Sequence, residues 1–291
     1  MTVSHQAVAQ FGPAPIEQFA EYDAASKSSI AYDSVDTILE AFVVADRDRH
    51  VVRYGVIKGQ GQRVIESLVA GFEKLPVSKL NRDEQLAYWL NLRTLMVIHA
   101  TSSAYPSANP KSLLASNSGF LNTQLITISG QDLSIKDVDN ILLTHWKDEP
   151  NLVFGLIVPA AGSPDFPTSA FTGAEVHQQL EQAGRDYINR KDVVKAKKGK
   201  VTLSEFLVWH QDHFGGETAM VAHIRALAQP KLASKWADMA SVQSRFDWKL
   251  NALRERSLAS GAAGRRGGGF EGGGFGGNGA IGGGDRFGGG S

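Results

Sequence analysis

The chain has 291 residues, and its 30 Lys and Arg are balanced by 30 Asp and Glu, so the formal net charge is zero. This balance removes the usual electrostatic argument for a specific nucleic-acid partner or a membrane-surface partner. The chain contains no cysteine, which excludes disulfides, thiolate metal sites, iron–sulfur clusters and cysteine nucleophiles.

Composition divides the chain into three parts. Residues 1–29 form an arm with Gly12, Pro13 and Pro15, which we expect to dock on the rest. Residues 30–260 have ordinary globular composition and a length that one domain accounts for. Residues 261–291 contain 17 Gly in 31 positions, and such a segment buries too little apolar surface to offset its ordering entropy. We therefore expect a disordered tail.

The ends of the sequence leave the compartment open. Residues 1–10 contain no basic region followed by an apolar run, so no secretory signal is predicted. The sequence as written indicates a cytoplasmic protein, and a mature secreted form would look the same. The longest apolar stretch, Leu152–Gly162, is 11 residues long, well short of the ~20 needed to span a bilayer, and reads as a buried strand.

The first strong element is a helix that starts at Asn81 and ends before Tyr105-Pro106. Asn81 is placed to cap the first turn, with Glu84 three residues later as in a capping box. Its apolar residues lie on most sides rather than in one stripe, which favours a helix buried in the centre of the domain.

Strands and helices then alternate irregularly. We expect strands at residues 125–128 and 152–158, and a hairpin over 193–203 that turns at Lys198-Gly199. Helical spacing covers residues 175–189, 204–213, 217–228 and 234–239, with Ser204 as an N-cap. The pattern predicts an α+β fold: a helix-rich single domain with a small antiparallel sheet.

Several ordered motifs resemble the domain-of-unknown-function 547 family. They run from about residue 30 to residue 253, so the arm and the tail lie outside the resemblance. The motifs are Asn81 to Asn91 with His99, Leu133 to Val138, Phe154-Gly155-Leu156, Trp209 with Asp212 and Phe214-Gly215, and Phe246 to Asn251. The family is distantly similar to papain-like and transglutaminase-like cysteine enzymes, so the resemblance implies a papain-like core.

Two departures from the family pattern bear on function. Family members carry Asn-Cys-Gly and then Ser-Cys-Pro where this chain has Ile157 to Pro164, so Val158 and Ser163 stand at the two cysteine positions. Val158 has no nucleophilic group, and a serine hydroxyl needs an adjacent base to react. In the core helix, Arg93-Thr94 stands where the family has Tyr-Asn, which indicates a rebuilt polar network around Asn91.

Five residues are candidates for a site. If the protein is an enzyme, the catalytic candidates are Ser163 as nucleophile, His99 as general base and Asn91 as an orienting group. Asn91 and His99 lie two turns and ~80° apart on one helix, so they need not touch. Arg93 and Trp89 are candidate ligand-binding residues, although Arg93 also fits a salt bridge with a buried carboxylate.

Other polar groups give weaker signals. His210 and His213 share one side of an expected helix and could begin a metal site, but an exposed helix face accounts for them better, and we expect no metal or cofactor. The lysines of the hairpin fit a solvated edge. The tail holds a single Arg265-Arg266 pair before its glycines, which fits a flexible extension better than specific RNA binding.

Three functions remain open. The first is a non-catalytic binding or scaffold module for a protein or peptide, in a fold that has lost thiol chemistry. The second is a thiol-independent hydrolase or acyl transferase that uses Ser163 and His99. In the third, the folded domain is a carrier and the tail makes multivalent contacts. The sequence does not fix the oligomeric state.

Overall fold

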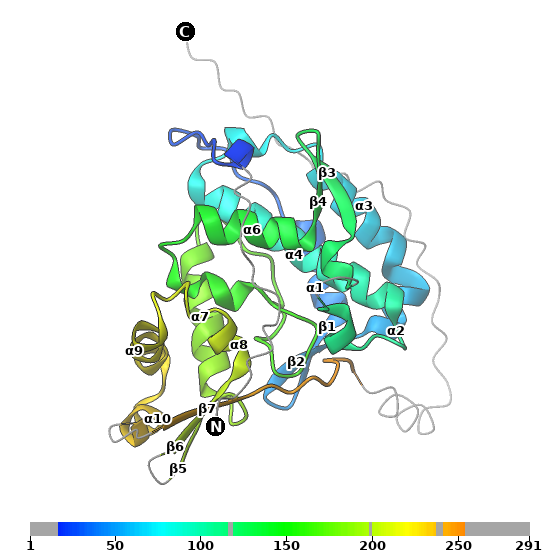
Figure 1. The fold of residues 1–291 in the computed structure, drawn as a ribbon. Coiled ribbons are helices and arrows are strands. Elements are labelled where there is room, and N and C mark those ends of the chain that lie inside the picture. The colour runs from blue at the N-terminus through cyan, green and yellow to red at the C-terminus, as the bar shows by residue number, and fades with distance from the viewer. Residues whose placement is uncertain (1–16, 116–118, 198–199, 237–240, 254–291) are drawn as a thin grey trace.

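A computed structural model of the chain describes residues 17–115, 119–197, 200–236 and 241–253. The fold is α+β and rich in helix, as the sequence predicts (Figure 1). Helix α4 (Arg82–Ala104), with 23 residues, runs through the middle of it. Among the described residues, no helix combines the length and the apolar character needed to cross a bilayer.

Most of the described chain is helical. The other α-helices are α1 (Asp33–Phe42), α2 (Tyr54–Val56), α3 (Gln62–Phe72), α5 (Pro110–Leu113), α6 (Ile135–His145), α7 (Val176–Asn189), α8 (Glu205–Trp209), α9 (Glu217–Leu227) and α10 (Pro230–Ala233). A π-helical stretch, η2 (Ile57–Gly61), joins α2 to α3. The 3-10 segments are η1 (Glu17–Phe19), η3 (Val77–Lys79), η4 (Phe120–Asn122), η5 (Pro150–Gly155) and η6 (Ser234–Trp236).

The strands form three small sheets at separate places on the helical body (Figure 1). Two are antiparallel hairpins, β1 (Val43–Asp46) with β2 (Arg49–Val52) and β3 (Gln124–Ile128) with β4 (Gln131–Ser134). The third contains β5 (Lys195–Lys197), β6 (Lys200–Ser204) and β7 (Ser241–Arg245). β5 pairs antiparallel with β6, but β7 adds in parallel. This sheet is therefore mixed, because a long return through α8, α9 and α10 brings β7 back to β6 in the same direction.

The central helix confirms the main prediction from sequence. The Asn81 side chain accepts the Glu84 N–H at 3.0 Å, so Asn81 is the N-cap. The capping box is only half formed, because the Glu84 carboxylate accepts the Ile30 N–H instead. Nearly all residues from Glu84 to Ile98 are buried. α3, α6 and α7 all pack on this helix, which explains why its apolar residues do not form one stripe.

Two hydrophobic clusters fill the interior. The larger surrounds α4 and includes side chains of α1, α3 and α6. The smaller lies between the β5–β6–β7 sheet, the second half of α7, α8 and α9. η5 contributes to both clusters, since Leu152 belongs to the larger and Val153 and Phe154 to the smaller.

The described part of the arm docks on α4, as expected. Phe19 is buried, and its ring meets the ring of Trp89 edge to face with centroids 5.1 Å apart. The Gln85 side chain donates to the Glu21 carbonyl at 2.8 Å. Residues 1–16 of the arm and the expected tail over 261–291 lie outside the described residues.

Several predicted elements are confirmed, including β3, the β5–β6 hairpin, α7 and α9. The turn Lys198-Gly199 lies outside the described residues. The predicted strand over 152–158 is wrong, because Pro150 starts the 3-10 helix η5 and the Glu149 side chain caps it by accepting the Asn151 N–H. A short, fully apolar run fits a buried strand and a buried helical turn equally well.

Two predicted helices are shorter than expected. Ser204 caps α8 as predicted, but this helix ends at Trp209 rather than at residue 213. At residues 234–239 the structure has only η6, and residues 237–240 are not described.

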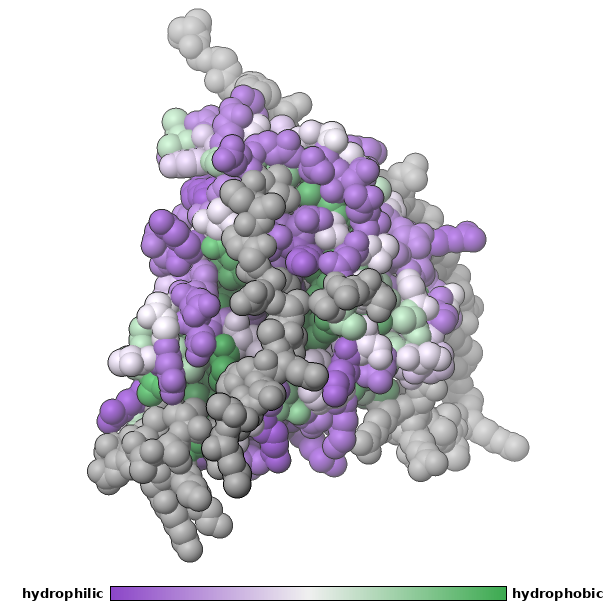
Figure 2. All heavy atoms as spheres, viewed as in Figure 1, coloured by the Kyte–Doolittle hydropathy of each residue, from purple (hydrophilic) through white to green (hydrophobic). Residues whose placement is uncertain are grey.

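On the face shown in Figure 2, hydrophilic residues dominate and hydrophobic ones show only in limited areas.

Candidate functional site

Asn91 holds a loop against the central helix. It is buried in α4, and its side-chain amide makes two hydrogen bonds to the backbone of Phe171. The Asn91 Nδ2 donates to the Phe171 carbonyl at 2.8 Å, and the Phe171 N–H donates to the Asn91 Oδ1 at 2.9 Å. This pairing satisfies both buried polar groups of Phe171 and fixes one end of the loop before α7. The geometry assigns Asn91 a positioning role.

Arg93 forms a buried ion pair with Asp139 of α6, as its salt-bridge reading predicts. Its Nε and Nη2 donate to the two carboxylate oxygens, and its Nη1 donates to the Ile157 carbonyl at 2.6 Å. Both side chains are almost fully buried. Burial raises the pKa of Asp139, while the Arg93 guanidinium acts in the opposite direction.

A small cavity lies beside this ion pair and encloses about 30 Å³, room for roughly one water molecule. Apolar side chains from η4, α6 and α8, and from the segments that follow α5 and η5, close most of it. Its lining residues are Arg93, Leu114, Leu121, Asp139, Leu143, Leu156, Val158, Phe206, Trp209 and His210. We call this space the enclosed cavity.

The interpretation of His210 and His213 as an exposed helix face is wrong, because neither residue lies in α8 and neither is exposed. Because α8 ends at Trp209, His210 lies in the following turn, where its ring packs on Phe206 at a centroid distance of 4.8 Å. Burial, together with the nearby His213 and Arg93, lowers the pKa of His210 to about 3. His210 is therefore neutral at physiological pH.

Ser163 is not placed beside His99. The Ser163 hydroxyl is buried and accepts the Val158 N–H at 2.9 Å, so Val158 and Ser163 contact each other. The His99 ring lies toward the C-terminal end of α4, where its Nε2 contacts the Glu66 carboxylate at 3.1 Å. No hydrogen bond joins Ser163 to a histidine among the described residues.

The loop that carries Ser163 is held on both sides. Arg190 donates to the carbonyls of Ser163 and Ala161, at 2.8 Å and 2.6 Å, and also pairs with Asp165. The Tyr187 hydroxyl donates to the Gly162 carbonyl at 2.6 Å. These donors satisfy the carbonyl groups of a buried turn, so the loop is built as a structural element.

Residues 246–253, which we call the strap, cover the same loop from outside. The N–H groups of Ala161 and Gly162 donate to strap carbonyls at 2.7 Å and 2.9 Å. A Cβ atom on Gly162 would lie 2.7 Å from the Asp247 nitrogen, so only glycine permits this approach. Strap side chains Phe246 and Trp248 also pack on Trp209, which lines the enclosed cavity.

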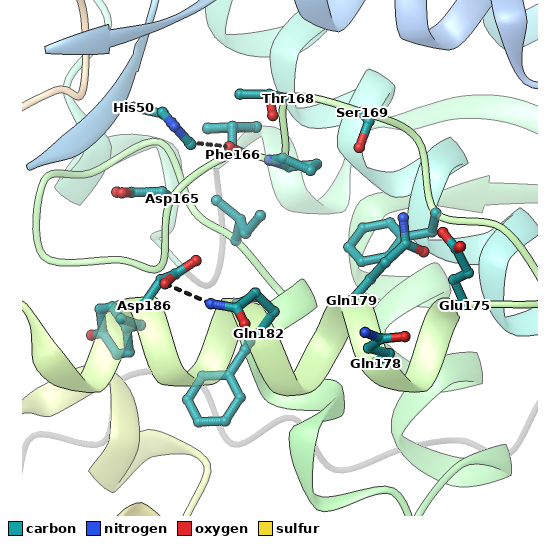
Figure 3. Close-up of a pocket in the computed structure, with 16 residues that line it drawn as sticks. His50, Asp165, Phe166, Thr168, Ser169, Glu175, Gln178, Gln179, Gln182 and Asp186 are labelled. Carbon is teal, nitrogen blue, oxygen red and sulfur yellow. Dashed lines mark hydrogen bonds between the residues drawn. The ribbon is translucent and has the colours of Figure 1, made fainter. Parts of the chain in front are cut away.

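An open groove lies elsewhere, along one side of α7 (Figure 3). We call it the α7 groove. Its first half has a volume of about 370 Å³. One wall is α7, which presents Glu175, Gln178, Gln179, Gln182 and Asp186, and the other is the loop 165–171 with His50 of β2. Phe154, Ile157, Phe166 and Phe171 form a floor beneath it and are almost fully buried.

The loop wall of the groove is firmly anchored. Besides the Asn91 clamp on Phe171, Asp36 accepts the Ala170 N–H at 2.6 Å, and Gln179 bonds both Ala170 and Thr172. In contrast, Thr168 and Ser169 are exposed and make no hydrogen bond among the described residues. The wall thus combines fixed ends with a middle whose polar groups face solvent.

The groove continues toward the C-terminal end of α7. This second half has a volume of about 670 Å³ and shares His50, Asp165, Gln182 and Asp186 with the first. It carries five basic residues and three acidic ones: Arg47, Arg49, Arg185, Arg190 and Lys191 with Asp48, Asp165 and Asp186. Several of these are already paired, such as Arg49 with Asp192 and Arg185 with Glu181.

Sequence reasoning missed the groove entirely. None of the five predicted site residues lines the groove, although Asn91 bonds Phe171 and Arg93 bonds Ile157, which both line it. Arg93 lines the enclosed cavity, and Trp89 is fully buried between Phe19 and Tyr88. The one available signal was the polar side of the helix over 175–189, but a row of glutamines there also fits an ordinary solvated face. Among the described residues, no cluster of three or more His, Asp or Glu is suited to hold a metal ion.

Comparison with known proteins agrees with the family resemblance over the central part of the chain. Residues 77–188 match the family described as "Protein of unknown function, DUF547". The matched region runs from η3 to the last turn of α7 and so includes α4, the loop with Val158 and Ser163, and the α7 wall of the groove. No curated protein and no solved structure matches the chain. The DUF547 match thus supports an uncharacterised domain and names no reaction.

Proposed function

We propose that this protein is a non-catalytic binding module that takes an extended peptide segment of another protein into the α7 groove. One observation carries the proposal: the groove is open and preformed, and its walls display unpaired polar groups above apolar surface. The side chains of Gln178, Thr168 and Ser169 are exposed and have no hydrogen-bond partner among the described residues. Amide and hydroxyl groups of this kind pair with the backbone of an extended chain.

Preorganisation supports this use of the groove. Asp36, Asn91 and Gln179 fix the loop at residues 170–172 before any ligand arrives. A wall that is already ordered costs little further entropy when a ligand binds. A volume of about 370 Å³ in the first half falls in the range of ligand clefts, whereas the enclosed cavity holds roughly one water molecule.

The loss of catalysis belongs to the same proposal. We infer that the enclosed cavity is the remnant of a cysteine-enzyme site in a papain-like ancestor. Val158, at a family cysteine position, lines this cavity beside the neutral His210 and the Arg93–Asp139 pair. The nucleophile is absent, and the space is too small for a substrate. Ser163, at the second cysteine position, accepts the Val158 N–H with its hydroxyl oxygen.

The test is selection of peptides from a random display library on the full chain, followed by affinity measurement. Gln178→Trp would fill the groove, and Glu181→Trp would place the same side chain on the same helix outside it. We expect Gln178→Trp to abolish binding and Glu181→Trp to leave it unchanged. Equal binding by both variants would contradict a role for the groove.

Hydrolysis tests the enzymatic alternative. Ester, peptide and isopeptide substrates are offered to the wild type, Ser163→Ala and His99→Ala, with the folding of each protein confirmed by circular dichroism. We expect no turnover above the buffer rate. Turnover that disappears in both variants would establish a serine-dependent hydrolase and overturn the binding proposal.

A further inference from the structure

The α7 groove lies close to the place where the described chain ends. Ala252 pairs with Val52 of β2, and the Leu253 N–H donates to the Val52 carbonyl at 3.0 Å. His50, which lines both halves of the groove, is two residues away on the same strand, or ~7 Å at strand spacing. The 38 residues 254–291 therefore start next to one wall of the groove.

These residues include a segment whose chemistry complements the first half of the groove. Arg265–Phe275 has the sequence RRGGGFEGGGF, with two arginines, two phenylalanines, six glycines and Glu271, so its formal charge is +1. The first half of the groove carries Asp165, Glu175 and Asp186 around apolar surface. Glu175 is exposed and its carboxylate has no partner among the described residues, so it is available to an arginine.

We propose that Arg265–Phe275 of the same chain occupies the α7 groove and competes with external peptides. The inference rests on the proposed function, because it names a regulator of the same site. The arginine pair lies against Glu175, and the two phenylalanines pack over the buried apolar floor of the groove. The glycines allow the backbone to approach Gln178, Thr168 and Ser169 closely because they carry no side chain.

The geometry of the connection permits this occupancy. Eleven residues, 254–264, separate Leu253 from Arg265, and a flexible linker of that length has an end-to-end distance of roughly 20 Å. α7 has 14 residues and is ~21 Å long, and eleven extended residues reach up to ~36 Å, which is more than that length. A linker this short gives an effective concentration on the order of 1 mM, so a segment that binds with a dissociation constant near 0.1 mM would fill about nine grooves in ten.

The lack of cysteine makes a direct test possible, because a single introduced thiol is the only one in the full chain. Gln178→Cys places this thiol in the groove, and Glu181→Cys places it on the same helix outside. Maleimide labelling rates are compared with and without Phe270→Ala/Phe275→Ala. We expect the two tail substitutions to speed labelling at position 178 about tenfold and to leave position 181 unchanged. Phe287→Ala, outside the segment, is the matched tail control and should change neither rate.

A peptide obtained by the display selection separates the two proposals. If that peptide slows labelling at position 178 while the tail substitutions change nothing, the tail inference is wrong and the groove still binds peptides. If neither the peptide nor the tail affects position 178, both proposals fail. Equal acceleration at positions 178 and 181 would show a general loosening of α7 and would also overturn occupancy by the tail.

Discussion

An active site needs reactive groups and room for a substrate. The enclosed cavity has the first of these and the α7 groove has the second. The cavity has the chemistry, with a buried ion pair and a neutral histidine in about 30 Å³. The groove has the space, about 370 Å³ in its first half, but its walls carry mainly amide, hydroxyl and carboxylate groups. Among the described residues, no hydrogen bond joins a hydroxyl group to a histidine in either region.

This difference predicts whether substitutions in each region should reduce stability or binding. The ion pair of the cavity is committed to structure, so breaking it should cost stability. The free polar groups of the groove hold nothing together, so changing them should cost binding alone. Asn91 joins the two regions, because it belongs to the buried helix and anchors the groove wall.

The largest effect should come from breaking the buried ion pair. Arg93→Met leaves Asp139 charged and unpaired in the core, and we expect a loss of about 3–5 kcal/mol in the free energy of unfolding. Urea denaturation measures it. Arg93→Met/Asp139→Leu is the control, since removing both charges should restore much of the loss. A single variant as stable as the wild type would show that the pair does not organise this region.

Asn91→Leu should have the next largest effect. The substitution keeps the branched shape but leaves the N–H and carbonyl of Phe171 buried without partners, at a cost of about 2–4 kcal/mol. Peptide affinity should fall too, because the loop wall loses an anchor. Unchanged affinity with reduced stability would separate the groove from the core helix and would weaken the positioning role of Asn91.

His210 should make the protein sensitive to mild acid. Because its pKa is about 3 in the folded state and near 6.5 in the unfolded chain, its contribution to stability is present above pH 6.5 and is lost as pH falls. Between pH 7 and pH 5 the loss amounts to roughly 2 kcal/mol. His210→Phe should flatten this part of the stability curve. An NMR titration in which the His210 ring protonates near pH 6 would contradict the prediction.

Ser163→Ala should have a modest effect. The Val158 N–H loses its acceptor, which costs about 1 kcal/mol, and the change should leave peptide binding intact. Thermal unfolding and the affinity for a selected peptide measure the two quantities. A large fall in affinity with little change in stability would instead place Ser163 in the binding site.

The smallest effect concerns His177 at the start of α7. Burial alone would lower its pKa, but hydrogen bonds to Glu149 at 2.5 Å and to Asp83 at 3.1 Å, together with their negative charges, raise it. The stabilisation is therefore full below pH 6.5 and is lost as pH rises through the raised pKa. Because the side chain is half exposed, we expect roughly 0.5 kcal/mol. His177→Gln should remove this pH dependence, and an unchanged curve would contradict it.

The sequence predicts the fold well where one local signal dominates. The Asn81 cap and the all-round apolar pattern locate α4, and Ser204 marks the start of α8. Prediction fails at residues 152–158, where an apolar run has no periodicity to decide between a strand and the 3-10 turn that Pro150 starts. The parallel pairing of β7 with β6 is also not predicted from the sequence, because it depends on a long-range return of the chain.

The site is harder to predict than the fold for a related reason. His99 and Ser163 look reactive in sequence, but their contacts are set by residues far away, Glu66 for one and the Val158 backbone with Arg190 for the other. The groove arises where β2, the loop 165–171 and α7 meet. Three segments that are ordinary by themselves form it, so no local motif marks it.

Hydrogen–deuterium exchange of the full chain with and without a selected peptide tests the central claim most directly, because it observes both regions in one sample. We expect slower exchange at residues 165–171 and along α7, with no change at residues 158–163 or 209–214. Protection confined to residues 158–163 and 209–214 would place the ligand at the enclosed cavity and would contradict a binding role for the groove.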